Sequence, residues 1–258
     1  MVEANSAQAG GVWSDAAARF HAEALAGSDY VAVVGGALRV GLGPCPSLLD
    51  IGAGCGSLGA SLLDRPARWT AIEPNRFMQR AVRRRAAVEP GWRVTVLGCR
   101  WQDAAPAVLA GHAVVLCANI PGLTPSLTDH PAPLLARVRT VADRVAWVVP
   151  AQAGPRRFCL SGLLPSALHG EDETPGHELT LAALGPRQAP RSMALVDWTF
   201  RCRFDDFDSA RRRLAASYGE PAWDQPGSAL DHALRRVLRP SDDGLIAEVP
   251  KRSALMLW

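Results

Sequence analysis

Residues 48–59 of the chain read Leu-Leu-Asp-Ile-Gly-Ala-Gly-Cys-Gly-Ser-Leu-Gly. The apolar run that ends at Ile51 is typical of a short buried strand, and the residues from Ser57 onward have helical spacing. Between them stand three alternate glycines, Gly52, Gly54 and Gly56, which can adopt backbone conformations that a Cβ forbids. The stretch therefore predicts a strand, a tight turn that lets the backbone approach a ligand, and a helix whose N-terminus faces that ligand.

Two classes of ligand use such a turn, and the neighbouring residues favour one of them. Residues 54–59 match the dinucleotide pattern G-x-G-x-x-G, which is a weak signal by itself. Asp50, however, stands where dinucleotide folds usually carry an apolar residue. The next expected strand ends in Glu73, whose carboxylate can accept both hydroxyls of a ribose, and the polar and aromatic cluster at 101–103 can border an adenine.

Three stretches, taken in order, resemble the first three motifs of the class I S-adenosyl-L-methionine (SAM)-dependent methyltransferases. They are Asp50-x-Gly-x-Gly-x-Gly, Ala71-Ile72-Glu73-Pro74 and Gly98-Cys99-Arg100-Trp101-Gln102-Asp103, and the resemblance covers roughly residues 13–150. It implies SAM as the cofactor, with S-adenosyl-L-homocysteine as its product. It also implies these cofactor-binding residues: Asp50, Gly52, Ala53, Gly54, Gly56, Glu73, Pro74, Trp101, Gln102 and Asn119.

Strand-like and helical segments alternate through the first 150 residues, which predicts an α/β fold with a doubly wound sheet. The resemblance specifies a Rossmann-like, seven-stranded class I methyltransferase sheet, mostly parallel with its last strand antiparallel. We expect strands near 47–51, 68–73, 92–97, 112–117 and 144–149, and helices near 57–64, 75–88, 103–109 and 130–142.

The chain divides into four expected parts: an N-terminal helical cap (1–45), a SAM-binding core (46–150), an insertion (151–190) and the completion of the same sheet (191–258). The insertion is rich in proline and glycine and too long for a plain connection, so it predicts a lid over the substrate. A structural arm or a dimer contact stays open as an alternative. The ending predicts an antiparallel hairpin of 245–249 with 253–258, in which Ala254 to Trp258 form the reversed strand.

The composition of the chain disfavours several classes of protein: membrane-spanning, nucleic-acid-binding and metal-binding ones. The 258 residues carry a net charge of +3, and no apolar run approaches the ~18 residues of a membrane span. Two arginine runs, 83–85 and 211–213, lie in helical patterns beside acidic residues, which favours solvated helix faces over a nucleic-acid surface. The six cysteines lack metal-ligand spacing. We therefore expect a cytoplasmic protein, a monomer or homodimer, without a metal, a membrane or a nucleic-acid partner.

The end of the fourth expected strand is where this fold presents the methyl group. There Asn119-Ile120-Pro121 resembles the Asn-Pro-Pro-aromatic motif of amino methyltransferases, with Gly122 in place of the aromatic residue. Because the flat stacking surface is missing, we expect Asn119 to line the pocket near the methyl group while the acceptor is held elsewhere.

Candidate general bases follow in the insertion and just before it. We select His177, at the start of a helical piece, as the second catalytic candidate beside Asn119. Other candidates are His130, His169, Glu171 and Asp172, each of which equally suits an ordinary surface or capping role. The predicted function is methyl transfer to a small molecule at an N, O, S or C atom. A methyltransferase acting on RNA or protein, and a SAM-binding accessory protein without catalysis, remain alternatives.

Overall fold

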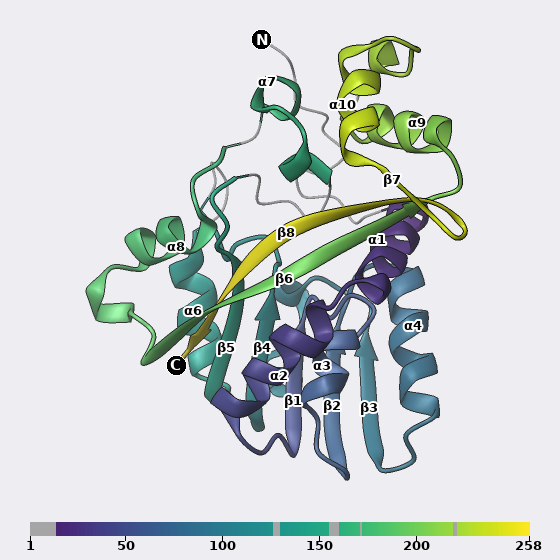
Figure 1. The fold of residues 1–258 in the computed structure, drawn as a ribbon. Coiled ribbons are helices and arrows are strands. Elements are labelled where there is room, and N and C mark those ends of the chain that lie inside the picture. The colour runs from purple at the N-terminus through teal and green to yellow at the C-terminus, as the bar shows by residue number, and fades with distance from the viewer. Residues whose placement is uncertain (1–13, 126–129, 155–159, 171, 219–220) are drawn as a thin grey trace.

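A mixed β-sheet runs through the middle of the molecule, in the order β3-β2-β1-β4-β5-β8-β6, and helices cover both of its faces (Figure 1). The computed structural model describes residues 14–125, 130–154, 160–170, 172–218 and 221–258. The strand order reverses direction between β1 and β4, so the carboxyl ends of these two neighbours form the edge where open α/β sheets bind ligands.

Five parallel strands form the first part of the sheet. They are β1 (Ser47–Ile51), β2 (Ala67–Ile72), β3 (Trp92–Leu97), β4 (His112–Ala118) and β5 (Ala142–Pro150). All five lie close to the ranges expected from the sequence. β1, β4 and β5 have almost continuous buried runs because helices cover them on both sides.

The helices bury two separate apolar clusters. On one face α2 (Tyr30–Leu42), α3 (Ser57–Leu62) and α4 (Arg76–Ala87) cover a cluster that contains Trp69. On the other face α5 (Pro106–Leu109), α6 (Pro131–Arg139) and α8 (Gly176–Leu184) cover a cluster that contains Trp147. The N-terminal helix α1 (Asp15–Gly27) packs against β6 and α4. Residues 1–13 of the expected helical cap (1–45) lie outside the described residues.

The far part of the sheet consists of two long strands, β6 (Ser192–Phe204) and β8 (Gly244–Leu257). β8 lies antiparallel between β5 and β6, which confirms the expected reversed strand. Trp258 is fixed in the fold as expected, because its Nε1 donates to the Gln188 carbonyl at 2.8 Å.

The expected hairpin of 245–249 with 253–258 is wrong, because both segments belong to one continuous strand, β8. Pro250 is the reason that the sequence suggested a break, yet the strand passes through it. Thr199, opposite Pro250 on β6, donates its N–H to Asp29 on the side away from β8. The missing N–H of Pro250 thus falls on the edge that faces away from β6, where β5 has already ended opposite Ser253.

Beyond the end of β5 the two long strands carry a small helical layer (Figure 1). It comprises α9 (Phe207–Tyr218), the 3₁₀ helix η4 (Pro221–Trp223), α10 (Ala229–Val237) and the short strand β7 (Arg239–Ser241). Leu214 and Leu234 of this layer pack in the same cluster as Phe204. The layer therefore extends the core rather than forming a second one.

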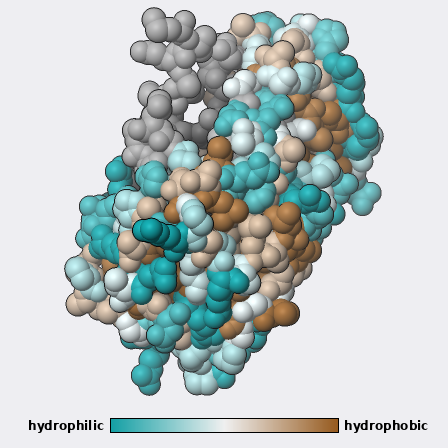
Figure 2. All heavy atoms as spheres, turned by 90° about the vertical axis from the view of Figure 1, so that its left-hand side faces the viewer, coloured by the Kyte–Doolittle hydropathy of each residue, from teal (hydrophilic) through white to brown (hydrophobic). Residues whose placement is uncertain are grey.

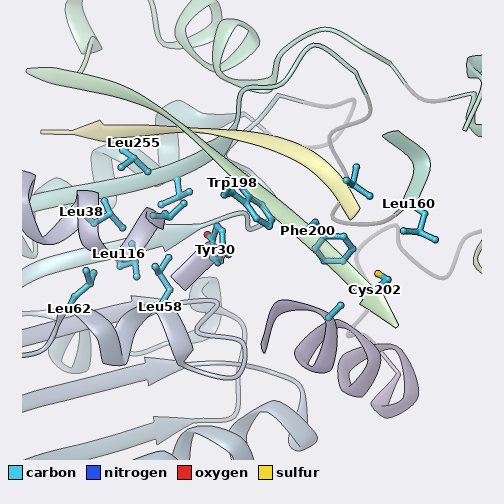
Figure 3. Packing of buried hydrophobic residues seen from close by; sticks show 14 of the residues in the cluster. Tyr30, Leu38, Leu58, Leu62, Leu116, Leu160, Trp198, Phe200, Cys202 and Leu255 are labelled. Atoms are coloured by element: carbon cyan, nitrogen blue, oxygen red, sulfur yellow. The ribbon is translucent and has the colours of Figure 1, made fainter. Parts of the chain in front are cut away.

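The insertion is split between the two faces of the sheet. Its first part comprises η2 (Leu160–Leu163), which lies against β8, and α7 (Ser166–His169), and Figure 3 shows Leu160 near Phe200. Its second part, α8, packs against β5 and α6, and a short 3₁₀ helix, η3 (Pro186–Gln188), leads back to β6. The lid function of this segment stays a prediction, and α8 contributes Leu184 to the core.

On the face shown in Figure 2, hydrophilic and hydrophobic residues are interspersed. Within the described ranges, no single helix is long and apolar enough to cross a membrane, whereas α1 and α2 pass that test together as a pair bent by 73°. The most exposed large apolar side chains are Val40, on α2, and Val88, just after α4.

Candidate functional site

The turn after β1 has the left-handed geometry that its glycines predict. Gly52, Gly54 and Gly56 have φ angles of 67°, 55° and 72°. The N–H groups of Gly52 and Ala53 both donate to the Ile72 carbonyl, at 2.8 and 3.1 Å, which fastens the turn to the end of β2. A Cβ on Gly52 would collide with the Ile120 side chain, so the turn and the loop after β4 are in close contact. Both the conformation and the space at this position require glycine.

Glu73 follows β2 and lies directly against the turn. Its carboxylate accepts the Gly54 N–H at 2.9 Å through one oxygen and the Asn75 N–H at 2.8 Å through the other. The side chain is buried, and burial raises the pKa of Glu73 whereas the two backbone donors oppose the rise. The sequence predicted ribose hydroxyls as the partners of this carboxylate; the structure adds backbone donors from the turn, and each oxygen keeps a further lone pair.

The segment after Glu73 is held by the start of α4. Asn75, the first residue of the helix expected near 75–88, caps α4 by accepting the Met78 N–H at 3.0 Å, as an asparagine at this position favours. Pro74 is half-buried between the two, and its carbonyl accepts from Gln79 Nε2 at 3.3 Å. The loop that connects β2 to α4 is therefore fixed by hydrogen bonds at each of its residues.

Asp50 lies on β1 beneath α3. A Cβ on Gly59 would collide with Asp50 Oδ2, so the third glycine of the G-x-G-x-x-G match makes room for a carboxylate. Burial raises the pKa of Asp50 to about 7, and the Glu73 carboxylate adds to the rise. The Trp69 indole lies near enough to favour the anion, but Asp50 Oδ2 has no partner with hydrogen-bond geometry among the described residues.

Asn119 directly follows β4 in a left-handed backbone conformation, which asparagine adopts more readily than most residues other than glycine. Its φ of 53° is left-handed, and such backbone strain, worth about 1–3 kcal/mol, clusters at functional sites. The Asn119 N–H donates to the Val148 carbonyl at 2.9 Å, and the side-chain Nδ2 donates to the Tyr30 hydroxyl at 2.8 Å. Asn119 Oδ1 is buried, and no described residue donates to it.

Tyr30 contacts Asn119, and sequence reasoning did not single it out. It begins α2, is 3% exposed, and packs its ring on that of Trp198 with 4.6 Å between centroids (Figure 3). Burial raises the pKa of Tyr30, and the charge of Asp50 adds to the rise, so the phenol stays neutral at physiological pH. Since a tyrosine at the start of a helix is most often a packing residue, the sequence carries no signal for its contact with Asn119.

Two oxygen atoms at this edge of the sheet lack hydrogen-bond partners among the described residues: Asp50 Oδ2 and Asn119 Oδ1. They come from the ends of neighbouring strands, since Asp50 pairs with Leu116 in the register of β1 and β4. A buried acceptor without a donor costs about 1–3 kcal/mol. Asp50 is level with Leu116, three residues before Asn119, so each of the two atoms calls for an N–H donor of its own.

Trp101 and Gln102 lie on the 3₁₀ helix η1 (Trp101–Asp103), after β3. Trp101 is half-buried, and the Arg137 guanidinium of α6 lies 5.3 Å from its ring centroid. Arg137 also donates to the Gln102 and Ala104 carbonyls at 3.4 and 3.0 Å. The Gln102 side chain is exposed. The structure thus places both residues at the carboxyl end of β3 and fixes that end to α6.

His177 lies in the first turn of α8, at the other side of the loop after β4. One turn further along α8, Thr180 donates its hydroxyl to the Leu123 carbonyl at 2.9 Å, which joins the helix to that loop. His177 is half-buried, its Nδ1 has no partner in the described chain, and burial lowers its pKa. A neutral imidazole of this kind has the proton state that a general base needs.

The other candidate bases are placed differently. His130 caps α6 by accepting the Ala132 N–H at 3.2 Å, and His169 is buried with its Nε2 3.4 Å from Glu173. Asp172 accepts the Thr174 N–H in a turn, and Glu171 lies outside the described residues. In the described ranges, no group of three His, Cys, Asp or Glu residues is arranged to hold a metal ion.

Five parallel strands in the order 3-2-1-4-5, followed by an antiparallel strand inserted before a last parallel one, form the sheet that the resemblance specified. The glycine turn lies at the reversal point of this order, between β1 and α3. The fold is that of the class I SAM-dependent methyltransferases. Two features identify this fold: the order of the strands in the sheet and the position of the glycine turn after β1.

Solved structures of methyltransferases resemble this chain. A putative methyltransferase from Bacillus halodurans C-125 is 11% identical over 83% of this chain and 92% of its own, with a TM-score of 0.48. Magnesium protoporphyrin IX methyltransferase from Synechocystis PCC 6803, solved with bound SAM, is 14% identical over 48% and 61%, with a TM-score of 0.38.

A third structure is 1,6-didemethyltoxoflavin-N1-methyltransferase from Burkholderia thailandensis, solved with 1,6-didemethyltoxoflavin and S-adenosylhomocysteine. It is 24% identical over 47% of this chain and 52% of its own, with a TM-score of 0.35. No family model matches the sequence, and no curated protein matches it. The likenesses concern the arrangement of strands and helices.

Proposed function

We propose that the protein is a SAM-dependent methyltransferase that acts on a small molecule. The observation that carries this proposal is the pair of unpartnered acceptors, Asp50 Oδ2 and Asn119 Oδ1, beside a left-handed glycine turn. SAM bears N–H donors in its ammonium and adenine amino groups and carries a positive charge, which suits a buried carboxylate and a buried amide oxygen as acceptors. A nicotinamide dinucleotide instead brings a pyrophosphate, which the buried Asp50 would repel.

The remaining contacts to the cofactor follow from the same edge of the sheet. Glu73 would accept the ribose hydroxyls through the lone pairs that the Gly54 and Asn75 N–H groups leave free. The turn residues Gly52, Ala53, Gly54 and Gly56, together with Pro74, would shape the backbone beside the cofactor. Trp101 and Gln102, at the end of β3, would border the adenine.

SAM supplies an already activated methyl group, so the chain has to align donor and acceptor and to exclude water. Asn119 is the residue best placed to line the transfer point, because its hydrogen bonds to Val148 and Tyr30 hold it just after β4. His177 would take a proton from an acceptor that carries one. Its lowered pKa keeps the imidazole neutral at physiological pH, which suits this role.

A small acceptor is favoured over a nucleic acid by the surroundings of the arginine runs. Arg211 is buried and contacts Asp208, Asp224 and Asp231 at 2.8, 3.3 and 3.3 Å, so it serves the packing of α9 with α10. Arg85 donates to Ser57 on α3 at 2.9 Å. Arg211, which is engaged within the fold, does not offer a free surface for phosphates, and Arg85 is partly used by Ser57.

Titration calorimetry with SAM, S-adenosylhomocysteine and NAD tests the cofactor. We expect micromolar binding of the first two, and binding of NAD alone would overturn the proposal. Mass spectrometry of a small-molecule extract incubated with the protein and methyl-labelled SAM tests the reaction. Labelled products are expected from the wild type and not from Gly52→Val, which blocks the cofactor turn. If SAM bound but no small molecule, RNA or protein became labelled, the result would support a SAM-binding accessory protein without catalysis.

A further inference from the structure

β6 lies at one end of the sheet and is paired along one edge with β8. The second half of its other edge is covered by the segment that joins α1 to α2, because the N–H groups of Thr199 and Arg201 donate to side chains there at 2.7 and 2.8 Å. No described residue pairs with this outer edge before Thr199. The stretch from 192 to 197, which we call the β6 edge, is therefore open, and it begins beside the C-terminus in Figure 1.

The backbone groups that the β6 edge presents belong to its odd-numbered residues. The N–H and C=O groups of one residue point to the same edge of a strand, and those of the next residue point to the opposite edge. The Thr199 N–H points away from β8, and β6 pairs with β8 in one continuous register from 192 to 204. The N–H and C=O groups of Met193, Leu195 and Asp197 therefore also point away from β8. A row of such groups is a template for a further strand.

Little on the β6 edge opposes the approach of a further strand. Proteins usually protect an edge with lysine, proline or a bulge, and none of these occurs between 192 and 197. Met193 and Leu195 point to one face and are 43% and 48% exposed. The charge of Asp197 is paired with Arg252 of β8 at 2.6 Å. The β6 edge is thus an exposed, largely apolar strand with an unused row of hydrogen-bonding groups.

The sequence of the β6 edge is complementary to itself when two copies run antiparallel. With Ala194 opposite Ala194 of a second copy, Met193 lies opposite Leu195 on both sides of the twofold axis. The outward N–H and C=O groups of these residues then form two hydrogen-bonded pairs, with four backbone hydrogen bonds between the copies. Two positions further out, the exposed Arg191 of each copy lies opposite Asp197 of the other. Apolar side chains thus meet apolar ones, and opposite charges meet at both ends.

Another position of the axis, at Leu195, fits the side chains less well. It would set Met193 against Asp197 of the second copy, an apolar side chain against a carboxylate. It would also extend the pairing to Thr199, whose N–H is already bonded within the chain. With Ala194 on the axis, the pairing stops before the covered half of β6 begins.

We propose that the β6 edge pairs antiparallel with the β6 edge of a second copy of the chain, with Ala194 on the twofold axis. The sheets of the two copies then form one continuous sheet, and the same surface is used on both copies, so the symmetry closes at a dimer. A strand from another protein could use the same backbone groups, but the match of apolar and charged side chains favours a second copy. This assembly is additional to the proposed methyl transfer and does not require a bound cofactor.

Sedimentation velocity of the full-length protein, over about a hundredfold range of concentration, tests the assembly. We expect a dimer whose fraction rises with concentration or is complete throughout. A protein that stays monomeric throughout, or that forms only larger assemblies, would overturn the proposal.

Leu195→Pro changes only the open side of the strand, because it removes an outward N–H and leaves the hydrogen bonds to β8 in place. Each dimer then loses two backbone hydrogen bonds, so its dissociation constant should rise about tenfold or more. Leu195→Lys should weaken the dimer by placing two ammonium groups in the interface, and it decides the question if Leu195→Pro does not fold. Val88→Lys is the matched control, because Val88 is 75% exposed and follows α4, which packs against β3 at the other end of the sheet. Equal sedimentation of Leu195→Lys and Val88→Lys would place any dimer contact elsewhere and overturn the proposal.

Ala194→Cys tests where the axis lies. Facing residues at a non-hydrogen-bonded position of an antiparallel pair have Cα atoms about 4.5 Å apart, which a disulfide can bridge. Mild oxidation should therefore join two Ala194→Cys chains, and it should join two Leu195→Cys chains or two wild-type chains much more slowly. Faster joining of Leu195→Cys than of Ala194→Cys, or joining of Ala194→Cys no faster than of wild type, would overturn the pairing with Ala194 on the axis.

Discussion

The proposed donor side and the surroundings of Asn119 are built by different means. On the donor side, the partners of Glu73 and the turn come from backbone groups within 48–75, a single continuous segment. Around Asn119 the contacts join distant segments, since its side chain donates to Tyr30, 89 positions earlier, and Thr180 donates to Leu123, 57 positions earlier. A site made of backbone leaves a pattern in the sequence, whereas a site made of distant side chains leaves single residues that look ordinary.

The largest expected effect is on the donor side, at Gly52. We expect Gly52→Ala to lower SAM affinity about a thousandfold, because the new Cβ meets Ile120 and the left-handed φ of 67° disfavours it. Gly43→Ala is the matched control, since Gly43 has nearly the same φ, 68°, with nothing near its Cβ. Calorimetry decides; equal affinities in the two variants would show that the turn does not contact the cofactor.

The next largest effect concerns His177, on α8. We expect His177→Asn to lower kcat about a hundredfold at saturating SAM, with SAM affinity unchanged, because general bases contribute about 10²–10⁴-fold. The pKa of His177 is lowered from 6.5, so wild-type kcat should be level at neutral pH and fall only in acid. The control is His232→Asn, an exposed site on α10. An unaltered pH profile in His177→Asn would remove His177 from the reaction.

A smaller effect is expected at Glu73. The Glu73→Gln variant keeps the volume but loses the charge that accepts two backbone donors, so SAM should bind about ten to a hundred times more weakly. Glu89→Gln is the control, because Glu89 forms an exposed pair with Arg65 at 2.6 Å. Circular dichroism establishes that both variants fold. If SAM bound the two variants equally well, the ribose would have to lie elsewhere.

The smallest expected effect is the pH dependence of SAM affinity, which we attribute to Asp50 on the donor side. Asp50, with a pKa of about 7, is largely protonated below neutrality, and a cationic ligand needs its anion. SAM affinity should therefore rise about tenfold per pH unit below pH 7 and level off above it, until the α-amino group of SAM loses its proton near pH 8. Asp50→Asn should abolish the acid limb. Calorimetry between pH 5.5 and 8.5 measures both, and an acid limb that persists in Asp50→Asn would exclude Asp50 as its source.

The same carboxyl affects stability in the opposite sense. Its pKa is raised in the folded protein above the 3.8 of the unfolded chain, so the fold binds this proton more tightly. The stabilising contribution is complete below pH 3.8 and is lost as pH rises toward 7. Denaturant melts should show wild type losing stability relative to Asp50→Asn across this window. No change in the difference would mean that Asp50 is ionised throughout.

Sequence reasoning succeeded where local rules decide the structure. The glycine turn, the cap at Asn75 and the carboxylate at the end of β2 depend on backbone conformation and on neighbours a few residues away. It failed at Pro250, because whether a proline breaks a strand depends on which edge the neighbouring strand uses. Tyr30 is a single residue whose contact with Asn119 arises only when distant segments pack, so no spacing marks it.

β8 has a consequence for how the chain folds. It is the last strand along the chain, yet it separates β5 from β6, which have no pairing with each other. β6 therefore cannot join the sheet until β8 has formed, and its register with β5 is set through a strand about a hundred residues downstream of β5. Contacts of such long sequence separation form slowly. During synthesis, the strands of the donor side can pair early, whereas the open edge of β6 takes shape only in the final step.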